Sequence, residues 1–183
     1  MLSIESTSFR DLLVLQPKQF VDHRGLFFES FNEARFRIQS GLNITFVQDN
    51  ISHSAKHVLR GLHFQVSPKS QAKLITVLSG SVLDVVVDLR RTEATFGQWF
   101  SMELSAANGK QLFIPEGFAH GFVALEENTI FHYKCSNYYS PDAERSLLWN
   151  DPTIGIQWPV EKPILADKDA SAPSFKELDV FFF

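Results

Sequence analysis

Short segments rich in β-branched and aromatic residues recur between residues 44 and 149, and turns containing glycine or proline separate them. Segments of this length and composition are typical of β-strands, and their close spacing leaves little room for helices. We therefore expect an all-β domain built as an antiparallel sandwich or barrel. The predicted strands are 44–51, 57–65, 73–80, 81–90, 96–104, 110–115, 120–125, 129–135 and 145–149.

Two local patterns refine this expectation. One helix is predicted at residues 32–40, where Asn32 can cap the N-terminus and Gly41 can end the helix. Ser79 and Gly80 lie between two predicted strands, and such a pair of turn residues is a hairpin signal.

The composition disfavours proteins that bind nucleic acid, contain disulfides or span a membrane. The 183 residues contain no repeat or linker, so we expect one domain over 1–183. The net charge is −4 without a basic run, which disfavours a nucleic-acid partner. The single cysteine, Cys135, excludes an internal disulfide and fits a cytoplasmic location. No stretch approaches the roughly 20 apolar residues of a membrane helix, and the N-terminus lacks the apolar run of a signal peptide.

Residues 109–124, GKQLFIPEGFAHGFVA, resemble the second cupin signature, except that Ala124 replaces its final asparagine. The first signature requires His-x-His and a later glutamate, whereas this chain has His63-x-Gln65 and no such glutamate. His63 and His120 alone are too few to hold a transition metal unless carboxylates complete the shell. The resemblance therefore implies a cupin-type jelly-roll barrel that lacks the metal and keeps the cavity.

Alternation along the strands places three side chains suited to proton transfer where they can line that cavity. His63 can take a proton near neutral pH, Tyr133 can give one, and Lys73 can stabilise an oxyanion. The same alternation puts Arg60 on the opposite face from His63, unless a β-bulge near Gly61 turns the strand. No glycine-rich nucleotide-binding loop follows a predicted strand.

A longer resemblance extends from about residue 10 to residue 175. It is carried by FVDHRGLFFESF, FVQDNIS, VLRGLHFQ, KLITVLSGSVLDVVVDLR, FIPEGFAHGF, YKCSNYYSPDAERSLLWNDPTIGIQWP and ADKDASAP. These stretches resemble the dTDP-4-dehydrorhamnose 3,5-epimerases, which are cupin homodimers without metal or cofactor. The resemblance implies an isomerase that inverts C3 and C5 of dTDP-4-dehydro-6-deoxy-D-glucose in dTDP-L-rhamnose biosynthesis.

The resemblance also implies residue roles. His63 would be the base that removes the proton next to the ketone, and Tyr133 would be the acid on the opposite face. Lys73 would stabilise the enolate oxygen. Asp169 would orient His63, with Asp84 as a rival partner for the same imidazole.

A further set would bind the nucleotide sugar, with Arg24 and Arg60 as the best pair for its diphosphate. The set comprises Arg24, Glu29, Gln48, Asp49, Asn50, Arg60, His120, Glu144 and Lys168. Two alternatives share the fold: an epimerase acting at C3 or C5 only on another dTDP-4-keto-deoxysugar, and a sugar-nucleotide ketoisomerase. A non-catalytic sugar-binding cupin and a metal-dependent oxygenase are the alternatives from other classes. Residues 181–183, three phenylalanines, are expected to pack on a partner subunit or on the chain's own barrel.

Overall fold

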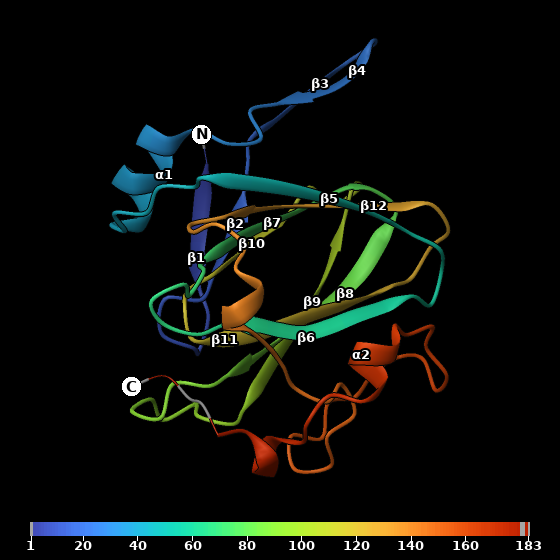
Figure 1. Cartoon of the computed structure of the whole chain (residues 1–183). Helices are drawn as coiled ribbons and strands as arrows, with labels where there is room; N and C mark the ends of the chain where they lie inside the picture. The colour runs from blue at the N-terminus through green and yellow to red at the C-terminus, as the bar shows by residue number, and fades with distance from the viewer. Residues whose placement is uncertain (1, 180–181, 183) are drawn as a thin grey trace.

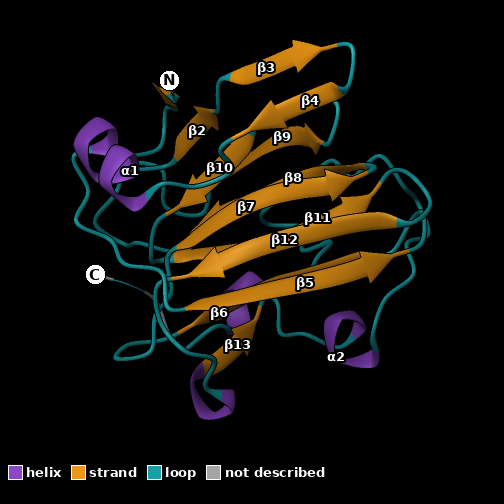
Figure 2. Ribbon diagram, turned by 90° about the horizontal axis from the view of Figure 1, so that it is seen from above, coloured by secondary structure: helices purple, strands orange, loops and turns teal. Residues whose placement is uncertain are grey.

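Two antiparallel sheets face each other and enclose the interior of a barrel, as Figure 1 and Figure 2 show. This computed structural model describes residues 2–179 and residue 182. One sheet has six strands and the other has five. The predicted all-β jelly roll with few helices is confirmed.

Each sheet brings together strands that are distant from one another in the sequence. In spatial order, the six-stranded sheet consists of Ser3–Ser6 (β1), Leu13–Gln16 (β2), Gln111–Ile114 (β10), Lys73–Ser79 (β7), Thr129–Cys135 (β12) and Gln48–Ser54 (β5). The five-stranded sheet consists of Glu144–Ser146 (β13), Leu59–Gln65 (β6), Phe118–Ala124 (β11), Ser81–Asp88 (β8) and Trp99–Ser105 (β9). A separate hairpin, Gln19–Asp22 (β3) and Gly25–Phe28 (β4), projects from the barrel in Figure 1.

The helical segments are short. They are Glu33–Ser40 (α1), Asp167–Ala170 (α2) and 3₁₀ turns at Pro141–Ala143 and Phe175–Glu177. In the part of the chain that the structure describes, no helix has the length and apolar character needed to cross a bilayer.

The barrel interior is an apolar core to which both sheets contribute. Phe122 of β11 and Phe131 of β12 come from opposite sheets, and their rings stack with centroids 4.0 Å apart. Both residues are almost completely buried. Aromatic stacking therefore ties the two sheets together inside the barrel.

The C-terminal segment covers the outer face of the five-stranded sheet, as Figure 1 shows. Its Leu147, Ile154 and Leu178 belong to the same buried cluster as Val85 and Val87 of β8. Because β8 is covered on this face and lines the barrel core on the other, both of its faces are buried, and five of its eight residues are apolar.

The C-terminal tail packs on its own barrel at Phe182. The Phe182 backbone hydrogen-bonds to Leu89 and Arg91, and its ring lies 6.1 Å from that of Phe64. The other two phenylalanines of the predicted tail contact, 181 and 183, lie outside the described residues.

The turn at Gly80 does not form the predicted hairpin. The strands on either side of it, β7 and β8, belong to different sheets. Gly80 has a φ of +74°, and its left-handed turn carries the chain from one sheet to the other. A turn between facing sheets requires the same residue types as a hairpin, so the sequence signal does not distinguish them.

Helix α1 forms as predicted. The side chain of Asn32 accepts a hydrogen bond from the first turn at 3.1 Å, and Gly41 ends the helix with a φ of +72°. The buried ring of Phe36 packs against Phe46, and residues 44–47 form a loop rather than the first half of the predicted strand. Strands β1 to β4 were not predicted, because they are short and three of them are largely exposed.

The β-bulge considered for β6 is present. His63 pairs with His120 of β11, whereas Arg60 pairs with Phe122, so two residues of β6 face Gly121 alone. The extra residue reverses the alternation along β6. As a result, His63 and Arg60 both line the cavity between the sheets.

The bulge requires glycine at position 61. Gly61 has a φ of +127°, and a Cβ atom there would lie 2.5 Å from Cα of Gly121. Replacement by alanine would add backbone strain and a clash with main chain.

We therefore expect Gly61→Ala to lower the free energy of unfolding by about 3 kcal/mol or more. Gly155→Ala is the control, because Gly155 also has a positive φ, of +68°, but no neighbouring atom within 4 Å. This control should lose only the backbone part, about 1 kcal/mol. Chemical denaturation measures both losses, and equal losses would contradict a role for the close contact.

Candidate active site

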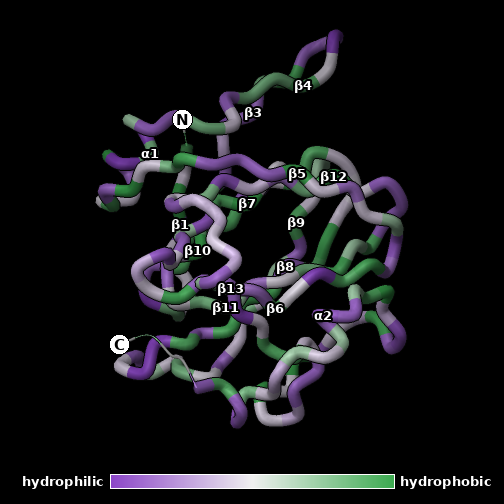
Figure 3. The backbone as a smooth tube through the Cα atoms, in the orientation of Figure 1, coloured by the Kyte–Doolittle hydropathy of each residue, from purple (hydrophilic) through white to green (hydrophobic). Residues whose placement is uncertain are grey.

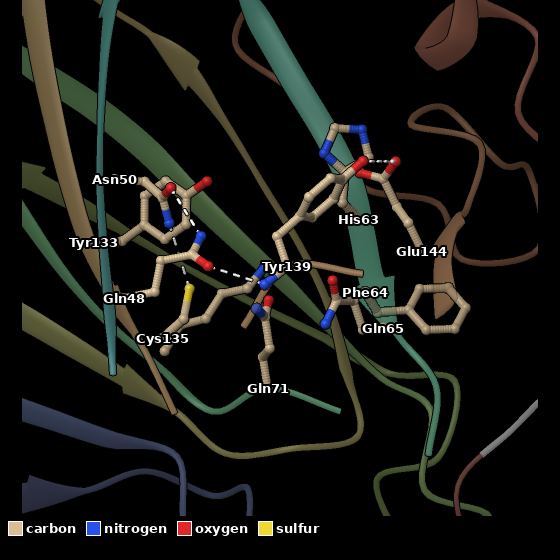
Figure 4. Close-up of a pocket in the computed structure, with 11 residues that line it drawn as sticks. Gln48, Asn50, His63, Phe64, Gln65, Gln71, Tyr133, Cys135, Tyr139 and Glu144 are labelled. Atoms are coloured by element: carbon tan, nitrogen blue, oxygen red, sulfur yellow. Dashed lines mark hydrogen bonds between the residues drawn. The ribbon is translucent and has the colours of Figure 1, made fainter. Parts of the chain in front are cut away.

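A polar cavity lies between the two sheets and has two lobes. His63, Lys73, Tyr133 and Glu144 line both of them. The first, which we call the amide lobe, has a volume of about 200 Å³ and is lined further by Gln48, Asn50, Phe64, Gln65, Gln71, Cys135 and Tyr139, as Figure 4 shows. The second, which we call the cationic lobe, has a volume of about 280 Å³ and is lined further by Ser52, Arg60, His120, Phe122, Phe131, Ala166, Lys168 and Asp169.

His63 forms a tight pair with Asp169. Nε2 of His63 lies 2.6 Å from Oδ1 of Asp169, and the other carboxylate oxygen accepts a hydrogen bond from the backbone N–H of Gly61 at 3.3 Å. Burial disfavours the charged carboxylate, but the bonds from His63 and Gly61 and the charge of Lys168 offset this and hold the pKa of Asp169 below its usual range. With the proton on Nε2, Nδ1 of His63 keeps a free lone pair.

Tyr133 faces His63 from the opposite sheet, since β12 and β6 lie on different sides of the cavity. Figure 4 shows the two side chains on either side of the amide lobe. Burial raises the pKa of the Tyr133 phenol, so this group keeps its proton at neutral pH. A protonated phenol opposite a basic imidazole can deliver a proton to the face that the imidazole does not reach.

Lys73 enters the cavity from the start of β7, with Nζ 5.8 Å from the centre of the Tyr133 ring. Burial lowers the pKa of its ammonium group, and the carboxylates of Asp84 and Glu144 oppose that shift. An ammonium group in this place can stabilise negative charge on an oxygen atom held between His63 and Tyr133.

A second histidine–carboxylate pair lies beside the first. Nε2 of His120 lies 2.9 Å from Oδ2 of Asp84, whose side chain is completely buried. Asp84 therefore contacts His120, and the rival pairing of Asp84 with His63 does not occur. Burial lowers the pKa of His120, although the charge and hydrogen bond of Asp84 partly offset the shift.

Comparison with known protein families identifies the relatives of this chain. Residues 6–177 match the family model described as dTDP-4-dehydrorhamnose 3,5-epimerase. The chain belongs to this epimerase family. These comparisons confirm the cupin fold and the epimerase family that the sequence predicted.

Individual relatives agree with the family assignment. The chain is 54% identical to the dTDP-4-dehydrorhamnose 3,5-epimerase of Salmonella typhimurium over 94% of this chain and 95% of the relative. A crystal structure of the Legionella pneumophila enzyme in complex with dTDP-4-keto-L-rhamnose superposes with a TM-score of 0.94 and 45% identity, covering 98% of this chain and 95% of that one. The Streptomyces bikiniensis 3'-monoepimerase ChmJ, in complex with dTDP-quinovose, superposes with a TM-score of 0.87 and 34% identity, covering 92% and 85%.

Most of the predicted substrate-binding residues of this family member gather at the cavity. Those that line it are Gln48, Asn50, Arg60, His120, Glu144 and Lys168. At the rim, Glu144 accepts hydrogen bonds from the hydroxyl of Tyr139 and the ammonium of Lys168, each at 3.2 Å. Glu144 therefore lies at the junction of the two lobes.

Three predicted residues do not line the cavity. Arg24 pairs with Asp22 at the tip of the β3–β4 hairpin, and Glu29 pairs with Arg35. Asp49 lies on the outer face of β5, where it binds a lysine of β12 at 3.0 Å. Alternation along β5 takes Asp49 away from the cavity because both of its neighbours, in the sequence QDN, point inward.

Gln65, at a cupin metal position, has a structural contact instead. Its amide nitrogen donates to the Lys69 carbonyl at 2.6 Å, and its oxygen accepts from the Ser140 backbone at 2.8 Å. Gln65 thus fixes the loops at the mouth of the amide lobe. Among the described residues, no group of three or more His, Cys, Asp and Glu side chains is arranged to hold a metal ion.

Sequence reasoning did not identify Ser52 and Gln71 as residues of the cavity wall. Ser52 could have been found, because it follows Gln48 and Asn50 in the two-residue period of β5. Gln71 lies in a loop before β7, where no periodicity applies.

The depressed pKa of His120 should make stability depend on pH. In the unfolded chain this imidazole binds a proton near pH 6.5, whereas burial lowers its pKa in the folded state. Between these two pKa values the unfolded state binds more protons, so the free energy of unfolding falls as the pH drops below 6.5.

His120→Gln removes this titration, so the stability advantage of the wild type over the variant should shrink at acidic pH. The expected change is at most about 1.4 kcal/mol per pH unit. Denaturant unfolding of both proteins at about pH 7.5 and about pH 5.5 measures it. A difference that does not change with pH would contradict the depressed pKa.

Proposed function

We propose that this protein converts dTDP-4-dehydro-6-deoxy-D-glucose to dTDP-4-dehydro-L-rhamnose by inverting C3 and C5 of the sugar. The observation that carries the proposal is the placement of His63 and Tyr133 on opposite walls of one cavity, with Lys73 between the two lobes. Membership of the epimerase family supports the same reaction.

The chemistry depends on the ketone at C4. C3 and C5 both flank this ketone, which acidifies the proton on each carbon. Nδ1 of His63 removes one proton, and the electron pair of the C–H bond moves into an enolate whose charge falls on the C4 oxygen. Lys73 stabilises that oxygen, while Tyr133 delivers a proton to the same carbon from the opposite face. Exchange with solvent then restores the protonation states of His63 and Tyr133 before the second carbon reacts.

Asp169 acts as the positioning residue for the base. Its carboxylate fixes the Nε2–H tautomer of His63 and stabilises the imidazolium that forms when Nδ1 takes the proton. Arg60 and Lys168 supply positive charge in the cationic lobe and bind the diphosphate. Gln48 and Asn50 supply amide donors in the amide lobe.

Isotope exchange in D₂O separates the base from the acid. Wild-type protein should place deuterium at both C3 and C5 of the product, because each proton is lost and replaced. His63→Ala should abolish exchange at both carbons. Tyr133→Phe should still exchange, but the enolate should recapture deuterium from the His63 side, so exchange with retention outruns inversion. NMR of the sugar ring over time measures all of these outcomes.

Each variant can contradict the scheme. If Tyr133→Phe inverts both centres at the wild-type rate, Tyr133 is not the acid. If His63→Ala still exchanges one carbon, a second base exists. Wild-type exchange at C3 alone would favour the second candidate function, a C3-only epimerase, to which the similarity with ChmJ points.

We also propose that the protein forms a homodimer, because large apolar side chains of the β3–β4 hairpin are exposed to solvent. They are Phe20, Val21, Leu26 and Phe27, with exposures of 54%, 77%, 47% and 70%. Figure 3 shows this apolar stretch on an arm that projects from the barrel. Such a patch suits a contact with a second copy of the chain. The hairpin tip carries Arg24 away from its own cavity, so Arg24 serves the cavity of the partner.

We further propose that the protein is located in the cytoplasm. The only cysteine of the chain, Cys135, is buried and forms no disulfide, which suits a reducing compartment.

Subunit mixing tests the exchange of Arg24. Arg24→Ala and His63→Ala should each be nearly inactive, but a mixed dimer would contain one intact site, with His63 from one chain and Arg24 from the other. A one-to-one mixture after joint refolding should regain about a quarter of wild-type activity. Mixtures of His63→Ala with Asp169→Asn are the control, since both changes lie in the same cavity and no intact site can form. Failure of the first mixture to exceed the control would show that Arg24 does not serve the partner.

A further inference from the structure

The inner face of β5 is polar along its whole length. Gln48, Asn50, Ser52 and Ser54 follow one another at the two-residue period of a strand. Gln48 and Asn50 line the amide lobe, and Ser52 lines the cationic lobe. A barrel strand with no apolar residue facing inward has little value for packing, which indicates that this face serves a ligand.

The two serines differ in their contacts. Oγ of Ser54 accepts a hydrogen bond from Nε of Arg60 at 3.2 Å, so Ser54 positions the guanidinium group. Oγ of Ser52 is buried, and among the described residues it has no hydrogen-bond partner. Of the three side chains in the described part of the chain that have such an orphaned atom, Ser52 alone lines the cavity.

The aromatic side chains next to Ser52 offer no hydrogen bond to its hydroxyl group. Phe131 pairs with Ser52 across β5 and β12, and Phe122 stacks on Phe131 behind it. A buried hydroxyl without a partner is unfavourable, and a group in the cavity would remove that cost. A hydroxyl is both a donor and an acceptor, so its complement in a sugar-binding cavity is another hydroxyl.

We propose that Ser52 is a specificity-determining residue whose side chain binds the C2 hydroxyl of the sugar. This inference depends on the proposed epimerisation. The substrate has hydroxyl groups on C2 and C3, but C3 is inverted during the reaction and its hydroxyl changes direction. C2 keeps its configuration, so only its hydroxyl can stay bound to a fixed strand residue from substrate to product. Ser52 would therefore hold the ring while both neighbours of the ketone are inverted.

The test compares two substrates, dTDP-4-dehydro-6-deoxy-D-glucose and its 2-deoxy analogue. Ser52→Ala should lower kcat/KM for the first substrate about tenfold and leave that for the 2-deoxy analogue within about twofold. Ser54→Ala is the matched control, because it makes the same chemical change on the same strand face. It should act through Arg60 and lower kcat/KM for both substrates by the same factor.

A measurement on the wild type covers the case in which Ser52→Ala fails to fold. Wild-type protein should bind dTDP-glucose about tenfold more tightly than dTDP-2-deoxyglucose. Equal affinities, or an equal loss of kcat/KM on both substrates in Ser52→Ala, would overturn the role of Ser52 while leaving the epimerase intact. Wild-type protein that binds but does not invert the full substrate would overturn the proposed function itself.

Discussion

The close approach of two glycine backbones, Gly61 of β6 and Gly121 of β11, determines the geometry of the cavity. Neither position has room for a side chain, since a Cβ on Gly121 would lie 2.7 Å from the carbonyl oxygen of Arg60. The contact accommodates the bulge, and the bulge brings both Arg60 and His63 to the inner face. The bulge also directs the N–H of Gly61 at Asp169. The same backbone segment therefore positions both His63 and the carboxylate that orients His63.

The two neighbouring histidine–carboxylate pairs have different environments and therefore different uses. His63 retains 24% exposure of its side chain and borders both lobes, so it can exchange protons with substrate and solvent. His120 retains 8% exposure and is kept neutral by burial. With Nε2 donating to Asp84, its Nδ1 can only accept a hydrogen bond. The His63–Asp169 pair is thus suited to proton transfer, and the His120–Asp84 pair is suited to accepting a hydrogen bond from a donor group of a ligand.

The sequence predicts the architecture well where periodicity and turn residues act locally. The all-β class, the caps of α1 and most of the central strands follow from such signals. The turn at Gly80 does not, because the choice between a hairpin and a crossing between sheets depends on which strands lie nearby in space. Arg60 illustrates the same limit, since only the close contact with Gly121 decides that the strand bulges.

In the candidate site, too, some residues could be predicted from the sequence and others could not. Strand alternation alone brings His63, Lys73 and Tyr133 together, and the family resemblance adds Asp169. Period-two reasoning on β5 would have excluded Asp49 and included Ser52, so these two were available from the sequence. The position of Arg24 could not be inferred, because it depends on a hairpin that leaves the barrel.

The partner of the base comes from a distant part of the chain. Asp169 lies 106 residues after His63, on a short helix in the segment that covers the outside of the barrel. Most of the strand pairings of the two sheets do not involve this segment, which is held on the barrel by its apolar contacts with β8. Local opening of the C-terminal cover would then separate the carboxylate from the imidazole without melting the barrel. The apolar contacts that hold this cover on β8 therefore also hold the carboxylate of Asp169 against the base.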